Sequence, residues 1–156
     1  MPAAREWPKS TGLKRHGEAA ILRDQGTVQR LTGDYAAAAV SLHQALQLFR
    51  ELGHRSGEAQ TLTCLGDLTS QTAGSQQARD HYARALAIAR DIGAPLEEAS
   101  ALEGLGHTYL QEGTTKEGAT RLLQALAIYQ RIGAPGARRV EETLRHHQMT
   151  PSTHIS

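Results

Sequence analysis

Residues 98–135 read EASALEGLGHTYLQEGTTKEGATRLLQALAIYQRIGAP, and much of this stretch recurs 40 residues earlier. The tetrapeptide ALAI stands at 85–88 and again at 125–128, and IGAP stands at 92–95 and again at 132–135. A second shift of 40 residues brings further matches into the same register: Glu18, Ala19, Leu22, Gly26, Ala45, Leu46 and Gly53. A fixed period of this size, present about three times, is typical of a stacked array of helices.

The composition also favours a thin stack of helices. The chain has 156 residues, which suits one domain. Aromatic residues make up 4% of it and alanine is abundant, as expected where helices approach closely through small side chains. The apolar content of 39% fits a quasi-linear array in which every helix keeps one solvent-exposed face.

Charge and cysteine content exclude several classes of protein. The 17 basic and 16 acidic side chains are interspersed, so no basic face is present and we expect no direct nucleic-acid binding. The single Cys64 excludes an intramolecular disulfide and a cysteine-rich zinc site. No leader and no long apolar run is found, so we expect a soluble cytoplasmic protein without a membrane interaction.

The period predicts the domain organisation. We expect about seven helices in a domain of residues 13–148, between a flexible N-terminal tail, 1–12, and a disordered C-terminal tail, 149–156. The domain divides into repeats at about 15–54, 55–94 and 95–134 and a polar capping helix at 137–148. Gly33 and Asp34 predict a helix end followed by an N-cap, and Thr114 with Glu117 predicts a capping box.

Three glycines recur in the middle of the first helix of each repeat, namely Gly26, Gly66 and Gly106. Glycine there costs about 1 kcal/mol relative to alanine, so its recurrence needs a structural reason. The small residues Ala38, Ala78 and Gly118 recur in the second helices, and we therefore predict close packing of each antiparallel pair.

These positions resemble the tetratricopeptide repeat. The Leu-Gly pairs at 65–66 and 105–106 match the pair of that family, and Ala45, Ala85 and Ala125 match its second alanine. The period of 40 residues is longer than the usual one. It is similar to the long repeats of Rap- and LGN-like proteins and of large actinobacterial transcription regulators. The resemblance implies an all-α fold, a right-handed α-solenoid of antiparallel helix pairs.

The resemblance also implies a concave groove lined by the first helix of each pair. The polar face of these helices supplies the candidate partner-binding residues: Arg23, Thr27, Arg30, Thr63, Asp67, Ser70, Glu103, His107 and Gln111. Such a mixed wall suits an extended peptide or a partner helix. It is equally typical of a solvated helix face that binds nothing. The chain contains no asparagine, so the family's clamp of lysines and asparagines is not expected.

No motif in the sequence indicates catalysis. We find no phosphate-binding glycine loop, serine elbow or HExxH helix, and predict no catalytic residue, cofactor or metal. His107 on a polar face is interpreted as solvated, and Cys64 as a packed side chain. His146 and His147 are adjacent on a helix and so point to different faces.

Three functional hypotheses follow. The first is a non-enzymatic scaffold that docks a protein or peptide in the groove. The second, by resemblance, is the sensor or oligomerisation domain of a transcriptional regulator whose DNA-binding part lies elsewhere. The third is a self-associating module such as a homodimer, because the apolar edge formed by Ile21 and Val28 has no neighbour in the array unless the N-terminal tail covers it.

Overall fold

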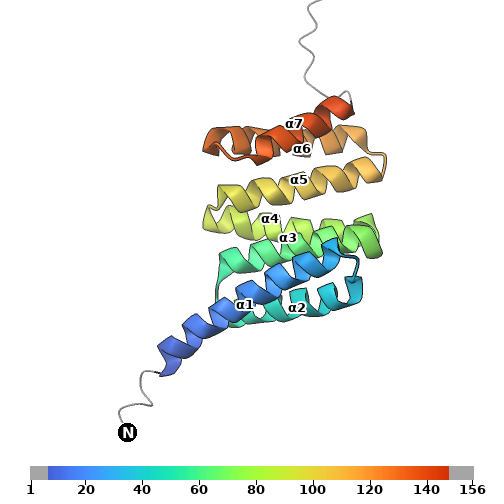
Figure 1. Cartoon of the computed structure of the whole chain (residues 1–156). Helices are drawn as coiled ribbons and strands as arrows, with labels where there is room; N and C mark the ends of the chain where they lie inside the picture. The colour runs from blue at the N-terminus through green and yellow to red at the C-terminus, as the bar shows by residue number, and fades with distance from the viewer. Residues whose placement is uncertain (1–6, 148–156) are drawn as a thin grey trace, which may run out of the picture.

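The computed structural model describes residues 7–147, with side chains from Gly12 onward. Within this range the chain forms seven α-helices and no strand. The helices are α1 (Trp7–Leu31), α2 (Tyr35–Glu51), α3 (Arg55–Thr72), α4 (Ser75–Ile92), α5 (Pro95–Gln111), α6 (Thr115–Ile132) and α7 (Gly136–His146). Figure 1 shows them stacked one above another, with α1 and α2 at one end and α7 at the other. The all-α repeat architecture predicted from the period is confirmed.

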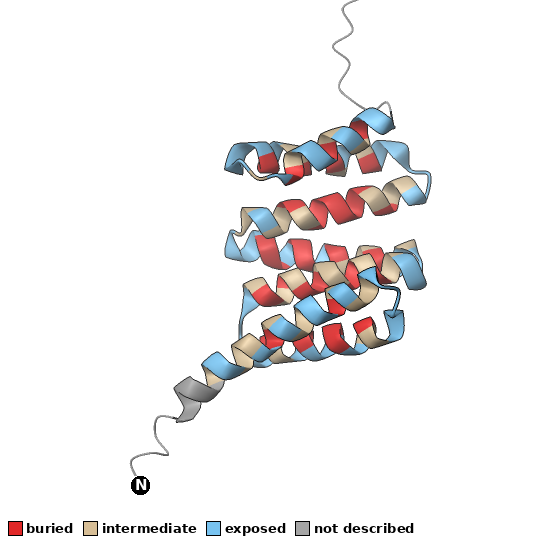
Figure 2. Cartoon of the chain, viewed as in Figure 1, coloured by how far each residue is buried: buried red, intermediate tan, exposed pale blue. Residues whose placement is uncertain are grey.

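Two layers run through the stack. Each helix packs against its neighbours in sequence, and α3 also contacts both α1 and α5. The first helices of the three pairs therefore form a common layer. Figure 2 shows buried residues along the inner faces of the helices and exposed residues on their outer faces and turns. The largest buried side chains include Phe49, Leu62, Leu102, Leu122 and Tyr129.

The first helix starts earlier than predicted. We expected a flexible tail to residue 12 and a helix from about Leu13, whereas α1 begins at Trp7. Pro8 is the second residue of α1, a position where the missing N–H group is not needed by the helix. The remaining residues of the predicted tails, 1–6 and 149–156, lie outside the described part of the chain.

The turns follow the predicted chemistry with one exception. Gly33 has a positive φ of 89°, and the Asp34 side chain accepts a hydrogen bond from the backbone N–H of Ala37. The prediction of a capping box at Thr114 was wrong. Its hydroxyl donates to the carbonyl oxygen of Tyr109 over 2.9 Å, so it caps the end of α5 and not the start of α6.

The recurrent glycines do mark close approach. A Cβ atom on Gly26 would lie 2.6 Å from Leu42 Cγ, and one on Gly106 would lie 2.6 Å from Leu122 Cγ. At Gly66 the ring of Tyr82 takes the same place, at 2.5 Å. Contacts below about 3 Å do not occur for real Cβ atoms, so each second helix needs glycine on its partner.

Candidate functional site

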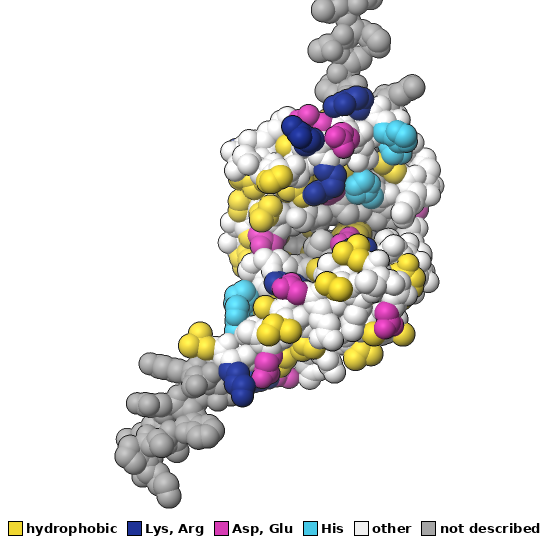
Figure 3. Space-filling model, in the orientation of Figure 1, with side chains coloured by type: hydrophobic (Ala, Val, Ile, Leu, Met, Phe, Trp, Pro, Cys, Tyr) yellow, Lys and Arg dark blue, Asp and Glu magenta, His cyan; other side chains and the backbone are white. Residues whose placement is uncertain are grey.

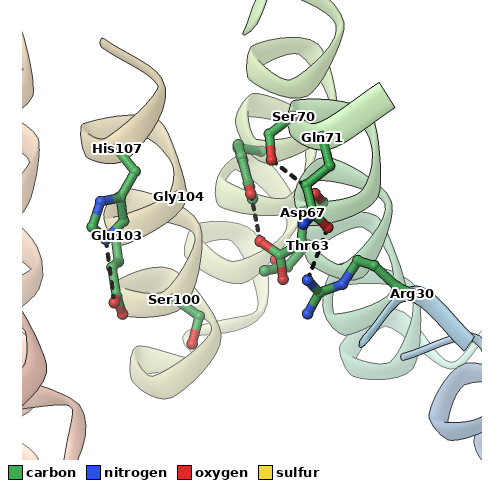
Figure 4. A pocket seen from close by; sticks show the side chains of 10 residues that line it. Arg30, Thr63, Asp67, Ser70, Gln71, Ser100, Glu103, Gly104 and His107 are labelled. Carbon is green, nitrogen blue, oxygen red and sulfur yellow. Dashed lines mark hydrogen bonds and ion pairs between the residues drawn. The ribbon is translucent and has the colours of Figure 1, made fainter. Parts of the chain in front are cut away.

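The inner faces of α3 and α5 border a cavity of about 490 Å³. It is lined by Arg30, Thr63, Asp67, Ser70, Gln71, Tyr82, Ser100, Glu103, Gly104 and His107. Figure 4 shows that Asp67 and Glu103 belong to the two facing helices, with Arg30 reaching in from α1. This volume lies within the range of about 300–1,000 Å³ that is usual for ligand pockets.

The structure gathers most of the predicted groove residues around this cavity. Arg30, Thr63, Asp67, Ser70, Glu103 and His107 line it. The other three lie elsewhere. Arg23 hydrogen-bonds Gln60, and the Thr27 hydroxyl donates to the Arg23 carbonyl oxygen over 3.1 Å. Gln111 is exposed at the last position of α5. The groove residues are thus divided between a central cavity and its surroundings.

Asp67 is a partly buried carboxylate that accepts a hydrogen bond from one side chain. The Tyr82 hydroxyl donates a hydrogen bond to its Oδ1 atom. Burial raises the pKa of Asp67, while the Tyr82 hydrogen bond and the charge of Arg30 act in the opposite direction. Burial and the charge of Asp67 also raise the pKa of Tyr82, so this hydroxyl remains a donor.

Tyr82 reaches the cavity from the second layer. Its ring lies where a Cβ atom on Gly66 or on Gly104 would collide with it, at 2.5 Å and 2.3 Å from its Cε1 atom. The ring therefore fills the space between α3 and α5 that two side chains would otherwise occupy. This placement carries the hydroxyl from α4 through to Asp67.

Glu103 is held by three different helices. Arg139 of α7 donates from Nε and Nη2 over 2.6 and 2.7 Å, and Tyr129 of α6 donates over 2.9 Å. His107 Nε2 lies 3.7 Å away, one turn along α5. Burial alone raises the pKa of Glu103, but the hydrogen bonds from these partners and the charge of Arg139 outweigh it and lower the pKa to about 2. Glu103 is therefore a charged, fully partnered group.

Comparison with known families gives a single clear finding. A model of the tetratricopeptide repeat matches residues 17–91. Residues 17–91 are thus similar to tetratricopeptide repeats. The match spans most of α1 and α2, α3 and nearly all of α4, and the same register continues through α5 and α6. A search of curated proteins finds no significant match to the chain.

Tetratricopeptide repeats are non-catalytic scaffolds that mediate contacts between proteins. The long-period variety and the link to transcription regulators stay predictions from the sequence. In residues 7–147 we find no helix with the length and apolar content that a membrane span requires. Figure 3 shows acidic and basic side chains interspersed over the visible face of the repeats.

Four of the residues that line the cavity between α3 and α5 were not predicted. They are Gln71, Tyr82, Ser100 and Gly104. Tyr82 packs among the apolar side chains of the core, which accounts for its ring but not for its hydroxyl. Gly104 did carry a signal, because the same register holds Cys64 and Asp24 in the other two repeats. Where one repeat has glycine and the others have larger residues, the glycine indicates that a side chain from a neighbouring helix occupies the space beside it.

A second, smaller cavity adjoins the one between α3 and α5. It has a volume of about 160 Å³ and shares Thr63 and Ser100 with the first. Gln60, Glu97 and the half-exposed Leu96 complete its lining. We call the two hollows together the α3–α5 furrow. It runs along both helices, from an apolar end at Leu96 to a polar end at Arg30 and His107.

Proposed function

We propose that the chain is a non-enzymatic scaffold that binds a segment of a partner protein in the α3–α5 furrow. The observation that carries this proposal is a cavity of about 490 Å³ between the first helices of two neighbouring repeats, lined mostly by polar and charged side chains. Tetratricopeptide repeats mediate contacts between proteins, so a polar furrow on this layer has a ready use.

The dimensions of the furrow fit a short peptide. Its lining on α3 extends from Gln60 to Gln71. At about 1.5 Å per residue these helical positions span about 16 Å. An extended strand rises about 3.3 Å per residue, so the furrow accommodates about five residues of a partner.

The polar side chains at the centre of the furrow are held in place by other residues of the chain. The hydrogen bonds and buried groups around Asp67 and Glu103 fix the central side chains before a ligand arrives. Preformed sites lose less conformational entropy on binding than flexible surfaces do. We therefore favour docking over the alternative of a solvated face.

Charge reversal at Arg30 tests the groove. We expect the Arg30→Glu variant to select a different set of peptides from a random dodecapeptide display library, and to bind wild-type-selected peptides about ten-fold more weakly. The side chain lines the cavity and donates to Gln71 Oε1 over 3.1 Å, so its replacement alters charge at the polar end. Fluorescence anisotropy with the selected peptides gives the affinities.

Arg84→Glu on α4 is the matched control, because Arg84 is exposed and lies outside the cavity lining. Equal binding by the wild type and both variants would place the peptide site away from the furrow. A library that yields no wild-type binder would count against peptide docking itself.

A specific observation also favours self-association through α1. Ile21 and Val28 are 66% and 59% exposed. The residues one repeat later, Thr61 and Leu68, are 0% and 3% exposed, because the preceding pair covers them. Within the described residues nothing covers this face of α1, which thus resembles an internal surface of the stack. We infer that a second copy of the chain covers it in a homodimer.

Two charged substitutions test the homodimer. We expect the wild type to elute as a dimer in light-scattering chromatography and the double variant Ile21→Glu/Val28→Glu to elute as a monomer. Both side chains are exposed, so helix content should stay unchanged in circular dichroism. Leu123→Glu on α6 provides a control at an exposed apolar residue outside α1. A wild type that stays monomeric at the highest attainable concentration would refute this dimer.

A further inference from the structure

The hydroxyl groups in the furrow's cavity are already engaged as donors. Thr63 donates to the Ala59 carbonyl oxygen over 3.2 Å, and Ser70 donates to the Asp67 carbonyl oxygen over 2.7 Å. The Tyr82 hydroxyl donates to the Asp67 side chain. A hydroxyl has one hydrogen and two acceptor lone pairs, so these oxygens retain only acceptor capacity.

Ser100 follows the same pattern through Tyr129. The Tyr129 hydroxyl donates its hydrogen to Glu103 Oε1 over 2.9 Å. The contact of 3.3 Å between Ser100 Oγ and Tyr129 Oη therefore requires Ser100 to be the donor. All four lining hydroxyls have their hydrogens directed into the protein. The centre of the cavity consequently presents acceptor atoms to a ligand.

The two carboxylates of the cavity differ in their partners. Glu103 receives two hydrogen bonds from Arg139 and one from Tyr129. Asp67 accepts from Tyr82, and within residues 12–147 it forms no ion pair. Asp67 is partly buried, and a carboxylate that is partly withdrawn from water and has no paired cation loses solvation that one hydrogen bond does not fully replace. Asp67 is the group in this cavity that gains most from a positive ligand.

The charge of Arg30 lowers the pKa of Asp67, but within the described residues the two side chains form no ion pair. Arg30 lines the cavity, and its guanidinium donates to Gln71 Oε1 at the polar end of the furrow. Figure 4 shows this contact beside Asp67. His107, on the opposite helix, is 3.7 Å from Glu103. The two basic groups that line the cavity are thus directed to Gln71 and Glu103.

We propose that the cavity holds the guanidinium or ammonium group of a basic side chain of the partner, paired with Asp67 and surrounded by hydroxyl acceptors. Such groups carry several donors and no acceptor, which complements an acceptor-rich centre. This inference rests on the proposed docking function and specifies its ligand. The half-exposed Leu96 at the other end of the furrow takes an apolar side chain of the same segment.

The spacing predicts a sequence signature in the partner. Gln60 at the apolar end and Asp67 are seven positions apart on α3, or about 10 Å along the axis. An extended chain covers this distance in about three residues. We expect bound peptides to carry an arginine or lysine about three positions from an apolar residue.

Capped amino acids test the cation site directly. N-acetyl amides of arginine, lysine, glutamate and norleucine share a backbone and differ only in the side chain. In nitrogen-15 NMR titrations we expect the arginine and lysine probes to shift the Asp67 and Gly104 amide signals, and the other two to leave them unchanged. In the Asp67→Asn variant the arginine probe should bind about ten-fold more weakly, since the charged pair is lost.

Asp67→Asn is a suitable variant because asparagine keeps an oxygen acceptor for Tyr82 and should fold at least as stably. Asp80→Asn removes the same charge from an exposed position of α4 and should bind the arginine probe as the wild type does. Equal affinity of Asp67→Asn and wild type for the arginine probe, or preference for the glutamate probe, would overturn the proposal.

The peptide library separates this inference from the docking function. Peptides that depend on Arg30 but contain no enriched basic residue would leave docking intact and refute the cation site. Peptides that are enriched in arginine or lysine and lose affinity for Asp67→Asn would support both. A library without any furrow-dependent binder, together with silent NMR titrations, would refute both.

Discussion

Replacing Arg139 by glutamine should lower the free energy of unfolding by about 3 kcal/mol, more than replacing its partner Glu103 by glutamine, for which we expect about 1–2 kcal/mol. The asymmetry comes from burial. The Glu103 side chain is 10% exposed and that of Arg139 is 62% exposed. Loss of Arg139 leaves a buried carboxylate without its cation, whereas loss of the Glu103 charge leaves an arginine that water can solvate.

The same pair sets a pH dependence. The pKa of Glu103 is lowered from 4.5 to about 2 in the folded chain. A folded pKa below the unfolded value means that the stabilisation is complete above about pH 4.5 and is lost as the pH falls toward about 2. With partial solvent screening we expect the loss to be on the order of 2 kcal/mol. In Arg139→Gln this loss should largely disappear, because burial then raises the pKa of Glu103.

Urea denaturation followed by circular dichroism at neutral and acidic pH measures both effects. Arg138→Gln is the control, since Arg138 is the exposed neighbour on α7 and should change stability by less than about 0.5 kcal/mol. The double variant Arg139→Gln/Glu103→Gln should be more stable than Arg139→Gln alone. If Arg139→Gln is no more destabilising than its control, α7 is not anchored to the stack through this ion pair.

The fold was predictable because the repeat pattern is a local property of the sequence. A shift of 40 residues aligns Leu62 with Leu102 and Gly66 with Gly106, and helical spacing then identifies the buried stripes. The start of α1 was not predictable in the same way. No periodic residue precedes Leu13, and Pro8 was interpreted as part of a tail, although proline is also compatible with a first helical turn.

The candidate site was predictable only where it lies on one helix face. Spacing along α3 and α5 placed Thr63, Asp67 and His107 on the inner layer. Arg139 was expected only as part of a polar capping helix, yet it reaches Glu103, 36 residues away. Such a contact depends on how α7 is set against α5, and helical periodicity contains no information about that placement.

Substituting alanine for Gly104 should lower the free energy of unfolding by about 2 kcal/mol, although alanine is the better helix former by about 1 kcal/mol. A Cβ atom there would lie 2.3 Å from Tyr82 Cε1. The ring cannot retreat easily, because Gly66 confines it from the adjacent helix at 2.5 Å. Gly17→Ala in α1 is the matched control. Its added Cβ meets no atom within 4 Å, so it should stabilise by about 0.5–1 kcal/mol.

The chain itself suggests how to rescue Gly104→Ala. One repeat earlier, the position equivalent to Tyr82 is Leu42 and the position equivalent to Gly104 is Cys64. A smaller side chain on the second helix thus coexists with a larger one on the next first helix. Tyr82→Leu by itself loses the hydrogen bond to Asp67, so it is the reference: in this background Gly104→Ala should cost at most half of what it costs in the wild type, measured as a coupling energy by urea denaturation. Additive losses would show that the ring of Tyr82 is not the reason for glycine at position 104. The space through which Tyr82 reaches Asp67 would then not depend on Gly104.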